Sequence, residues 1–185
     1  MSRKIAAFLA QGFEEAEAVV PIDMARRAGI EVDTVSIDGG YEVTGSHGIT
    51  VKADKLMKDI DSASYDMLML PGGMPGTVNL ENCTELAEML KEAHKAGKYL
   101  AAICAAPRIL GDLGLLEGER ATVYPGNEEH LKGAEYDAEA AAVTSGRVIT
   151  ARGMGCAVEF GGEIVSALTD SDTAEGILKS IQHIY

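Results

Sequence analysis

Short apolar runs alternate along this chain with amphipathic stretches of helical periodicity. Four apolar runs predict buried strands, at residues 4–9, 30–37, 65–70 and 98–103. Residues 14–28 and 84–96 predict helices, and each is followed by a glycine of the kind that ends helices. This alternation implies right-handed crossovers. We therefore expect an α/β fold with a mostly parallel central sheet and helices on both faces.

The remaining segments fit the same architecture. We expect hairpins at 42–44 with 49–52 and at 141–144 with 148–151, a short helix at 107–113, a strand at 121–124, and helices at 156–168 and 173–184. The 185 residues hold no linker, internal repeat or low-complexity segment, so we expect a single domain spanning residues 1–185.

Acidic residues dominate the charge of the chain. Lys and Arg number 16 against 29 Asp and Glu, which gives a formal net charge of −13. Nucleic acids and anionic membrane surfaces attract clustered cations, so neither is an expected partner. No apolar run approaches the roughly 20 residues of a membrane-spanning helix, and the run at residues 5–10 is too short for a signal peptide. Three cysteines without a C-x-x-C pair suit a reducing compartment, so we expect a cytoplasmic protein.

Cys104 is the first candidate for chemistry, because it follows a predicted strand directly and precedes a predicted helix. Small residues stand two positions before and after it, as the sharp turn of a nucleophile elbow requires. In a parallel sheet, this carboxyl edge is where binding crevices form. The start of the following helix is expected to lower the pKa of the thiol. The alternative is a buried cysteine that acts only as a small hydrophobic residue.

Glu17 is the second candidate. It shares a helical stripe with Val20, Met24 and Ala28, and this otherwise apolar stripe is expected to face the sheet. Burial there would raise the pKa of the carboxyl group, so that it stays a protonated donor. The alternative is that Glu17 caps its own helix or points outward with its acidic neighbours.

Backbone groups after a third strand complete the expected site. Gly72 and Gly73 would let main-chain N–H groups approach a ligand, and the N–H groups of Gly73 and Ala105 could form an oxyanion site. The alternative is a plain turn. The segment is not a G-x-G-x-x-G fingerprint, so dinucleotide binding is not predicted.

The other reactive side chains give no metal or cofactor motif. None of the four histidines has metal-ligand spacing, although His47 and His130 lie in loop-like contexts and stay candidates. Arg152 opens a glycine-rich segment that could bind an anion or simply turn the chain. Cys83 and Cys156 are interpreted as structural. We therefore expect no metal and no cofactor.

Five motifs together resemble one known family. In chain order they are EEAE at 14–17, RRAGI at 26–30, LPGG at 70–73, AAICAAP at 101–107 and RGMG at 152–155. They resemble the ThiJ/PfpI superfamily, a class I glutamine amidotransferase-like domain, and within it the DJ-one branch, which holds the parkinsonism-associated deglycase and its bacterial relatives. The resemblance covers nearly the whole chain. It implies a flavodoxin-like three-layer sandwich and a homodimer, with Arg27 and Glu14 at its interface.

The resemblance also implies a chemistry. Cys104 would be the reactive thiol, readily oxidised to a sulfinate, and Glu17 its protonated hydrogen-bond partner. Activities assigned to relatives are glutathione-independent glyoxalase, protein deglycase, and peroxide-linked redox sensing or chaperoning. We predict a cysteine-dependent stress-protection enzyme that acts on small reactive aldehydes or glycated substrates, of the glyoxalase III-like lyase or deglycase-like hydrolase type. The alternative is a redox sensor or chaperone that works through oxidation of Cys104 with little turnover.

Two departures from the family pattern bear on these predictions. Many relatives carry a histidine near the cysteine where this chain has Tyr124. Tyr124 can donate a hydrogen bond and stays a candidate catalytic residue in place of that histidine, but its phenol is a poor base near neutral pH because its pKa is about 10. Peptidase-like relatives carry a histidine directly after the cysteine, whereas this chain has Ala105, so proteolysis is not predicted. No later His-x-Glu pair of the amidotransferase kind is present in the sequence.

Overall fold

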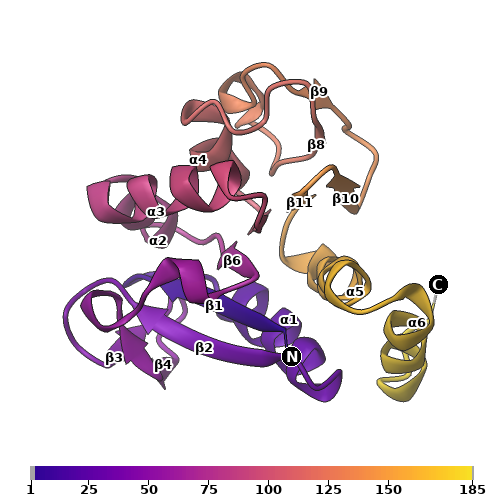
Figure 1. Ribbon diagram of the computed structural model, residues 1–185, viewed down its shortest axis with the longest axis horizontal. Coiled ribbons are helices and arrows are strands. Elements are labelled where there is room, and N and C mark those ends of the chain that lie inside the picture. The colour runs from indigo at the N-terminus through magenta and orange to yellow at the C-terminus, as the bar shows by residue number, and fades with distance from the viewer. Residues whose placement is uncertain (1–2, 185) are drawn as a thin grey trace.

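A computed structural model describes residues 3–184, which form a three-layer α/β sandwich (Figure 1). The central sheet has seven strands in the order β10-β11-β7-β6-β1-β2-β5. Its members are β1 (Lys4–Leu9), β2 (Glu31–Ser36), β5 (Lys55–Leu56), β6 (Met67–Leu70), β7 (Tyr99–Ile103), β10 (Ala142–Ser145) and β11 (Val148–Ala151). All neighbours pair in parallel except β10 and β11, which form an antiparallel hairpin. The mostly parallel sheet expected from the sequence is confirmed.

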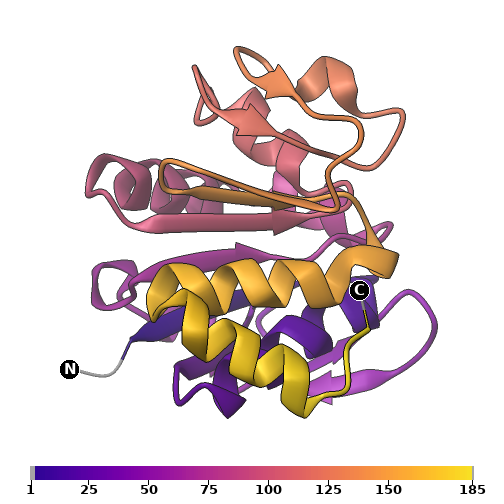
Figure 2. The same cartoon turned by 90° about the vertical axis from the view of Figure 1, so that its right-hand side faces the viewer.

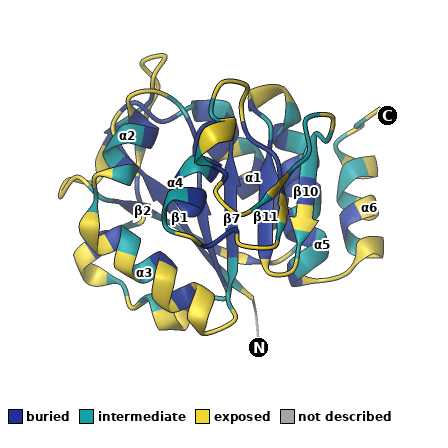
Figure 3. Cartoon of the chain, turned by 90° about the horizontal axis from the view of Figure 1, so that it is seen from above, coloured by how far each residue is buried: buried dark blue, intermediate teal, exposed yellow. Residues whose placement is uncertain are grey.

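Helices cover both faces of this sheet. α1 (Glu15–Arg27), α5 (Ala157–Leu168) and α6 (Ser171–Ser180) lie on one side, and Figure 2 shows α5 and α6 packed side by side. α2 (Gly76–Glu81), α3 (Thr84–Lys95) and α4 (Pro107–Asp112) lie on the other. Figure 3 shows the buried strands between helices whose outward faces are exposed. The flavodoxin-like sandwich implied by the resemblance is therefore confirmed.

The inner strands β1, β6 and β7 are almost entirely apolar because both of their faces are buried. Along β1, Ile5, Ala7 and Leu9 enter the core beneath α1 and α5, whereas Ala6 and Phe8 enter the core beneath α3 and α4. A strand that alternates between two buried layers reads as one continuous apolar run. Two small sheets lie outside the main one: β3 (Glu42–Thr44) with β4 (Thr50–Lys52), and β8 (Arg120–Ala121) with β9 (Glu135–Tyr136).

The strand expected at 65–70 begins at Met67, and two further predicted elements differ more from the structure. The strand expected at 121–124 is reduced to β8, because the N–H of Thr122 donates to the side chain of Thr150 and the N–H of Tyr124 donates to the carbonyl of Cys104. The last helix begins at Ser171 and ends at Ser180, not at 173 and 184. Its start is fixed by Asp170, whose carboxylate accepts the N–H of Thr173. Among residues 3–184, no helix is both long and apolar enough to cross a bilayer.

Candidate active site

Three chain segments meet at the carboxyl edge of the parallel strands. Cys104 follows β7, Gly72 and Gly73 lie in the loop after β6, and Glu17 lies in the first turn of α1. The N–H of Glu14 donates to the carbonyl of Gly72 over 2.9 Å, which ties the start of α1 to that loop. The structure therefore brings together the thiol, the carboxyl group and the glycine loop that the sequence singled out.

Cys104 occupies a strand-to-helix elbow. Its φ of 64° lies in the left-handed region, which a residue other than glycine adopts only where the surroundings hold it. Its N–H donates to the carbonyl of Ala151 over 2.9 Å, and its own carbonyl accepts the N–H of Tyr124 over 2.8 Å. Hydrogen bonds on both sides thus fix the backbone that presents the partly buried thiol.

Glu17 is buried, with 1% of its surface exposed. Its carboxylate accepts the N–H of Gly72 over 2.9 Å and forms a hydrogen bond with the Cys104 thiol. Burial raises the pKa of Glu17 to about 7, against the opposing effect of these two hydrogen bonds. Of the two orientations weighed from the sequence, the structure has the carboxyl group turned inward.

Gly72 must be a glycine for this contact to exist. A Cβ atom at position 72 would lie 2.5 Å from an oxygen of Glu17 and 2.7 Å from the Cβ of Cys104. Both distances are too short for real contacts, so the close approach of the loop to the thiol–carboxyl pair depends on the missing side chain. Gly73, with a φ of 91°, is packed as closely against the backbone of Glu14.

The pKa of the Cys104 thiol is raised, whereas the sequence analysis expected it to be lowered. Burial, and then the negative charge of ionised Glu17, raise it to about 12. The N–H groups of Ala105 and Gly73 donate to the sulfur and lower the pKa, but they do not compensate. The expectation of a lowered pKa is wrong, because burial and the charge of Glu17 outweigh the donors at the sulfur, and the six-residue α4 begins only three positions after the cysteine.

The thiol and the carboxyl group nevertheless titrate as a coupled pair. Ionised Glu17 repels a thiolate, whereas protonated Glu17 can donate a hydrogen bond to one. A thiolate at Cys104 therefore forms most readily when the shared proton resides on Glu17. Since the pKa of Glu17 is about 7, that carboxyl group can hold or release a proton near neutral pH.

Tyr124 lies beside the elbow but not inside it. Its side chain is about half exposed, and its ring packs over Gly153, where an added Cβ would lie 3.3 Å from the ring. Tyr124 and residues 152–156 line a shallow hollow of about 480 Å³. In the described residues, no hydrogen bond joins the phenol oxygen to another group, so it is available to a ligand.

Glu15 is a buried acidic residue that the sequence analysis did not single out. Burial acts to raise its pKa, but hydrogen bonds from its own N–H, from the N–H and ring of His47 and from the N–H of Ile49 lower it to about 2. The loop between β3 and β4 wraps around this carboxylate, and Gly45 leaves the space for it. The sequence hides this role, because the acidic run at 14–17 looks like a solvated helix start.

Glu14, Glu15 and His47 together are the one group of side chains among residues 3–184 with the geometry to hold a metal ion. Both oxygens of Glu15 already accept hydrogen bonds from the loop. The carboxylate of Glu14 lies 3.4 Å from the ring nitrogen of His47 and 3.3 Å from the hydroxyl of Ser46. We interpret the group as the anchor of the β3–β4 hairpin.

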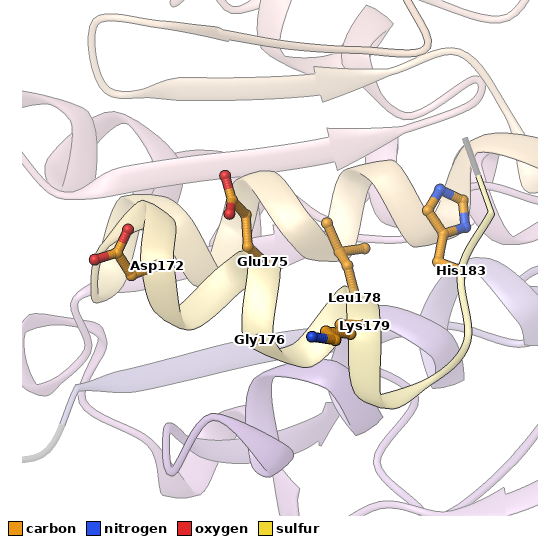
Figure 4. A pocket seen from close by; sticks show the side chains of 6 residues that line it. All are labelled: Asp172, Glu175, Gly176, Leu178, Lys179 and His183. Atoms are coloured by element: carbon orange, nitrogen blue, oxygen red, sulfur yellow. The ribbon is translucent and has the colours of Figure 1, made fainter.

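The remaining candidates lie outside the site. His130 forms an ion pair with Asp112 over 2.7 Å on the far end of α4, and the Cys83 thiol contacts the sulfur of Met57 at 3.9 Å. Cys156 precedes α5, and burial first, then Glu159, raise the pKa of its thiol. A larger hollow lies on the outer face of α6 (Figure 4) and includes no part of the Cys104 elbow. Its lining residues are Asp172, Glu175, Gly176, Leu178, Lys179 and His183.

Known sequences and structures share this architecture. Protein DJ-1 homolog B of Arabidopsis thaliana is 39% identical over 174 residues, which are 94% of this chain and 40% of that protein. This chain likewise covers 44% of DJ-1 homolog A of the same plant, so it spans less than half the length of these two relatives. Protein dj-1beta of Drosophila melanogaster is 31% identical over 186 residues, with both chains covered completely.

Solved structures agree over the full length of the chain. Oxidised DJ-1 of Toxoplasma gondii superposes with a TM-score of 0.94 at 35% identity, and DJ-1beta of Drosophila melanogaster with a TM-score of 0.94 at 31% identity. Each comparison covers 100% of both chains. The model of the DJ-1/PfpI family matches residues 3–167. The chain therefore belongs to the DJ-1/PfpI family.

Proposed function

We propose that this DJ-1-like stress-response protein is an enzyme that uses Cys104 to convert small reactive aldehydes without glutathione. The observation that carries the proposal is the buried hydrogen bond between the Cys104 thiol and Glu17, whose pKa of about 7 suits proton transfer. The N–H groups of Gly73 and Ala105 add two donors at the sulfur. The closely related deglycase reaction on glycated proteins would use the same first step.

The proposed reaction begins with addition of the thiol to the aldehyde carbon of methylglyoxal. The new S–C bond forms as the carbonyl π electrons move to oxygen, and the backbone N–H groups of Gly73 and Ala105 hold that oxyanion. The thiol proton, relayed through Glu17, then neutralises the oxygen and gives a hemithioacetal.

Isomerisation and hydrolysis complete the cycle. Glu17, as the carboxylate, removes the proton from the former aldehyde carbon and returns a proton to the neighbouring carbon. The resulting enediol thus becomes a lactoyl thioester. Water then cleaves the thioester, which releases lactate and restores the thiol. During isomerisation the proton of the C1 hydroxyl moves to the C2 oxygen, and during hydrolysis one proton of the water returns to the sulfur, in both cases through Glu17. The net reaction adds one water to methylglyoxal, so the proposed cycle uses no imidazole where Tyr124 stands.

The test is lactate formation from methylglyoxal without glutathione, measured for the wild type, Cys104→Ser and the matched control Cys83→Ser. Cys83 contacts Met57, away from the elbow, so its variant reports any general effect of losing a thiol. We expect lactate from the wild type and the control and none from Cys104→Ser. Turnover retained by Cys104→Ser, or absent from the wild type, would refute the proposal.

A second candidate function is oxidative sensing at Cys104. The structural relative from Toxoplasma gondii is described as oxidised DJ-1, and two N–H groups and Glu17 surround the sulfur here as donors for sulfinate oxygens. Mass spectrometry after mild peroxide treatment should then show two added oxygens at Cys104, and fewer in Glu17→Leu. If Cys83 or Cys156 is oxidised while Cys104 stays reduced, sensing at this site is excluded.

The assembly and the compartment are also proposals. We propose a cytoplasmic homodimer, in line with the resemblance and with apolar side chains exposed on α1 and just before β4, where Val19 is 49% and Ile49 is 59% exposed. Light scattering on the eluted protein would give a mass near 39 kDa, about twice 19.5 kDa, for a dimer. Fractionation of the source cells would test the compartment.

A further inference from the structure

Two segments beside the hollow next to Tyr124 form backbone hydrogen bonds with Cys104. One wall follows β11, whose last residue, Ala151, accepts the N–H of Cys104. Another part of the lining begins at Tyr124, whose N–H donates to the carbonyl of Cys104. A molecule in this hollow therefore lies against the two segments that hold the elbow in place.

Arg152 supplies the positive charge of this hollow. The other six arginines are all engaged: five form ion pairs with acidic side chains, and Arg147 stacks on the ring of Tyr99 with its guanidinium carbon 4.6 Å from the ring centre. Within residues 3–184, no ion pair, side-chain hydrogen bond or aromatic ring engages the guanidinium of Arg152. In a chain with 29 acidic residues, an arginine left without a carboxylate partner points to an anion from outside the chain.

Further observations indicate what kind of anion fits. Burial and Glu159 raise the pKa of the Cys156 thiol and the charge of Arg152 opposes them, so the two lining residues Arg152 and Cys156 lie close enough to interact electrostatically. The exposed side chains of Tyr124 and Met154 offer an aromatic and an apolar surface at its rim. The hollow thus combines a planar cationic fork with room for a short carbon chain.

We infer that Arg152 is a specificity-determining residue that binds the carboxylate of a small carbonyl compound and so presents its carbonyl carbon to Cys104. The preferred substrates would be aldehydes that carry a carboxylate, rather than neutral aldehydes of the same size, a preference that rests on the proposed function. Arginine binds carboxylates through two parallel hydrogen bonds, which fixes orientation as well as position.

Two alkylating reagents of similar size but different charge test the recognition step without any aldehyde. In both, the Cys104 sulfur displaces iodide as an S–C bond forms and a C–I bond breaks, but iodoacetate carries a carboxylate and iodoacetamide is neutral. The measured quantity is the rate constant for iodoacetate at Cys104 divided by the rate constant for iodoacetamide at Cys104. Mass spectrometry measures both rates. The neutral reagent corrects for any change in the reactivity of the thiol itself.

We expect Arg152→Gln to lower this ratio about fivefold or more, because the local concentration of the anion falls. Arg152→Lys should keep part of the preference for iodoacetate, because lysine keeps the positive charge but lacks the planar guanidinium group that forms two parallel hydrogen bonds. Arg147→Gln removes one positive charge away from the hollow and should leave the ratio as in the wild type. An equal fall in Arg147→Gln, or no fall in Arg152→Gln, would overturn the inference.

Competition by aldehydes then tests the substrate class. Glyoxylate, an aldehyde with a carboxylate, should protect Cys104 from iodoacetamide at lower concentration than neutral glyoxal, and Arg152→Gln should abolish that difference. Equal protection by both aldehydes in the wild type refutes the carboxylate preference but leaves the proposed function intact. If neither alkylating reagent modifies Cys104 and neither aldehyde reacts with it, the proposed function itself is refuted.

Discussion

Replacing Glu17 with glutamine should make the protein more stable at neutral pH. Burial raises the pKa of Glu17 from 4.5 to about 7 in the folded state. The folded protein therefore holds this proton more tightly than the unfolded chain does. The stability that the protonated group contributes is complete below pH 4.5 and is lost as the pH rises through 7. This difference in pKa corresponds to about 3 kcal/mol.

Glutamine keeps a carbonyl oxygen for the N–H of Gly72 and never ionises. The free energy of unfolding of Glu17→Gln, minus that of the wild type, should therefore increase between pH 4.5 and 7 by up to about 3 kcal/mol and then level off. Urea unfolding at a series of pH values from 4.5 to 8.5 measures this difference, and the exposed Glu31→Gln corrects for the loss of one carboxylate. A difference that stays constant across the range, or that decreases with rising pH, would refute the argument.

Three further predictions follow from the geometry of the site. Gly72→Ala should destabilise the fold by about 1–3 kcal/mol in urea unfolding, because the new Cβ overlaps Glu17 and Cys104; stability equal to that of the wild type would contradict the close packing. Glu15→Gln should lower stability at pH 7, and the loss should diminish as the pH falls from 4.5 through about 2, where the wild-type carboxylate is itself protonated. Tyr124→His should leave the urea midpoint nearly unchanged, because that side chain is about half exposed, and should add to the profile of lactate formation a base that titrates near pH 6.5.

The sequence was sufficient for the long elements of the fold because their hydrophobic patterns are unambiguous. β1, β7 and α3 agree with prediction to within a residue, whereas the two-residue strands β5 and β9 were missed. Such short strands carry no periodicity. α2 was also missed, because it begins with a glycine and has only six residues. Its position is set by hydrogen bonds from the N–H of Gly76 to the carbonyl of Gly12 and from the side chain of Asn79 to the carbonyl of Gln11, which no local pattern records.

Some features of the candidate site could also be predicted from the sequence, and others could not. Glu17 and Cys104 could be brought together from the sequence, because an acidic residue on an apolar stripe and a cysteine at a strand end meet at one edge of a parallel sheet. The direction of the pKa of Cys104 could not be predicted, because it depends on burial and on the charge of Glu17 rather than on the helix that follows. The anchoring role of Glu15 depends on a hairpin more than thirty residues away.

The two outer strands of the main sheet limit how this protein can associate with others. β5 pairs over only two residues, and β10 has only four residues. A flat, unprotected edge strand is a template on which another chain can extend the sheet and begin aggregation. Neither edge here offers a long row of free backbone groups. Because both edge strands are so short, a neighbouring chain finds few backbone groups here with which to extend the sheet.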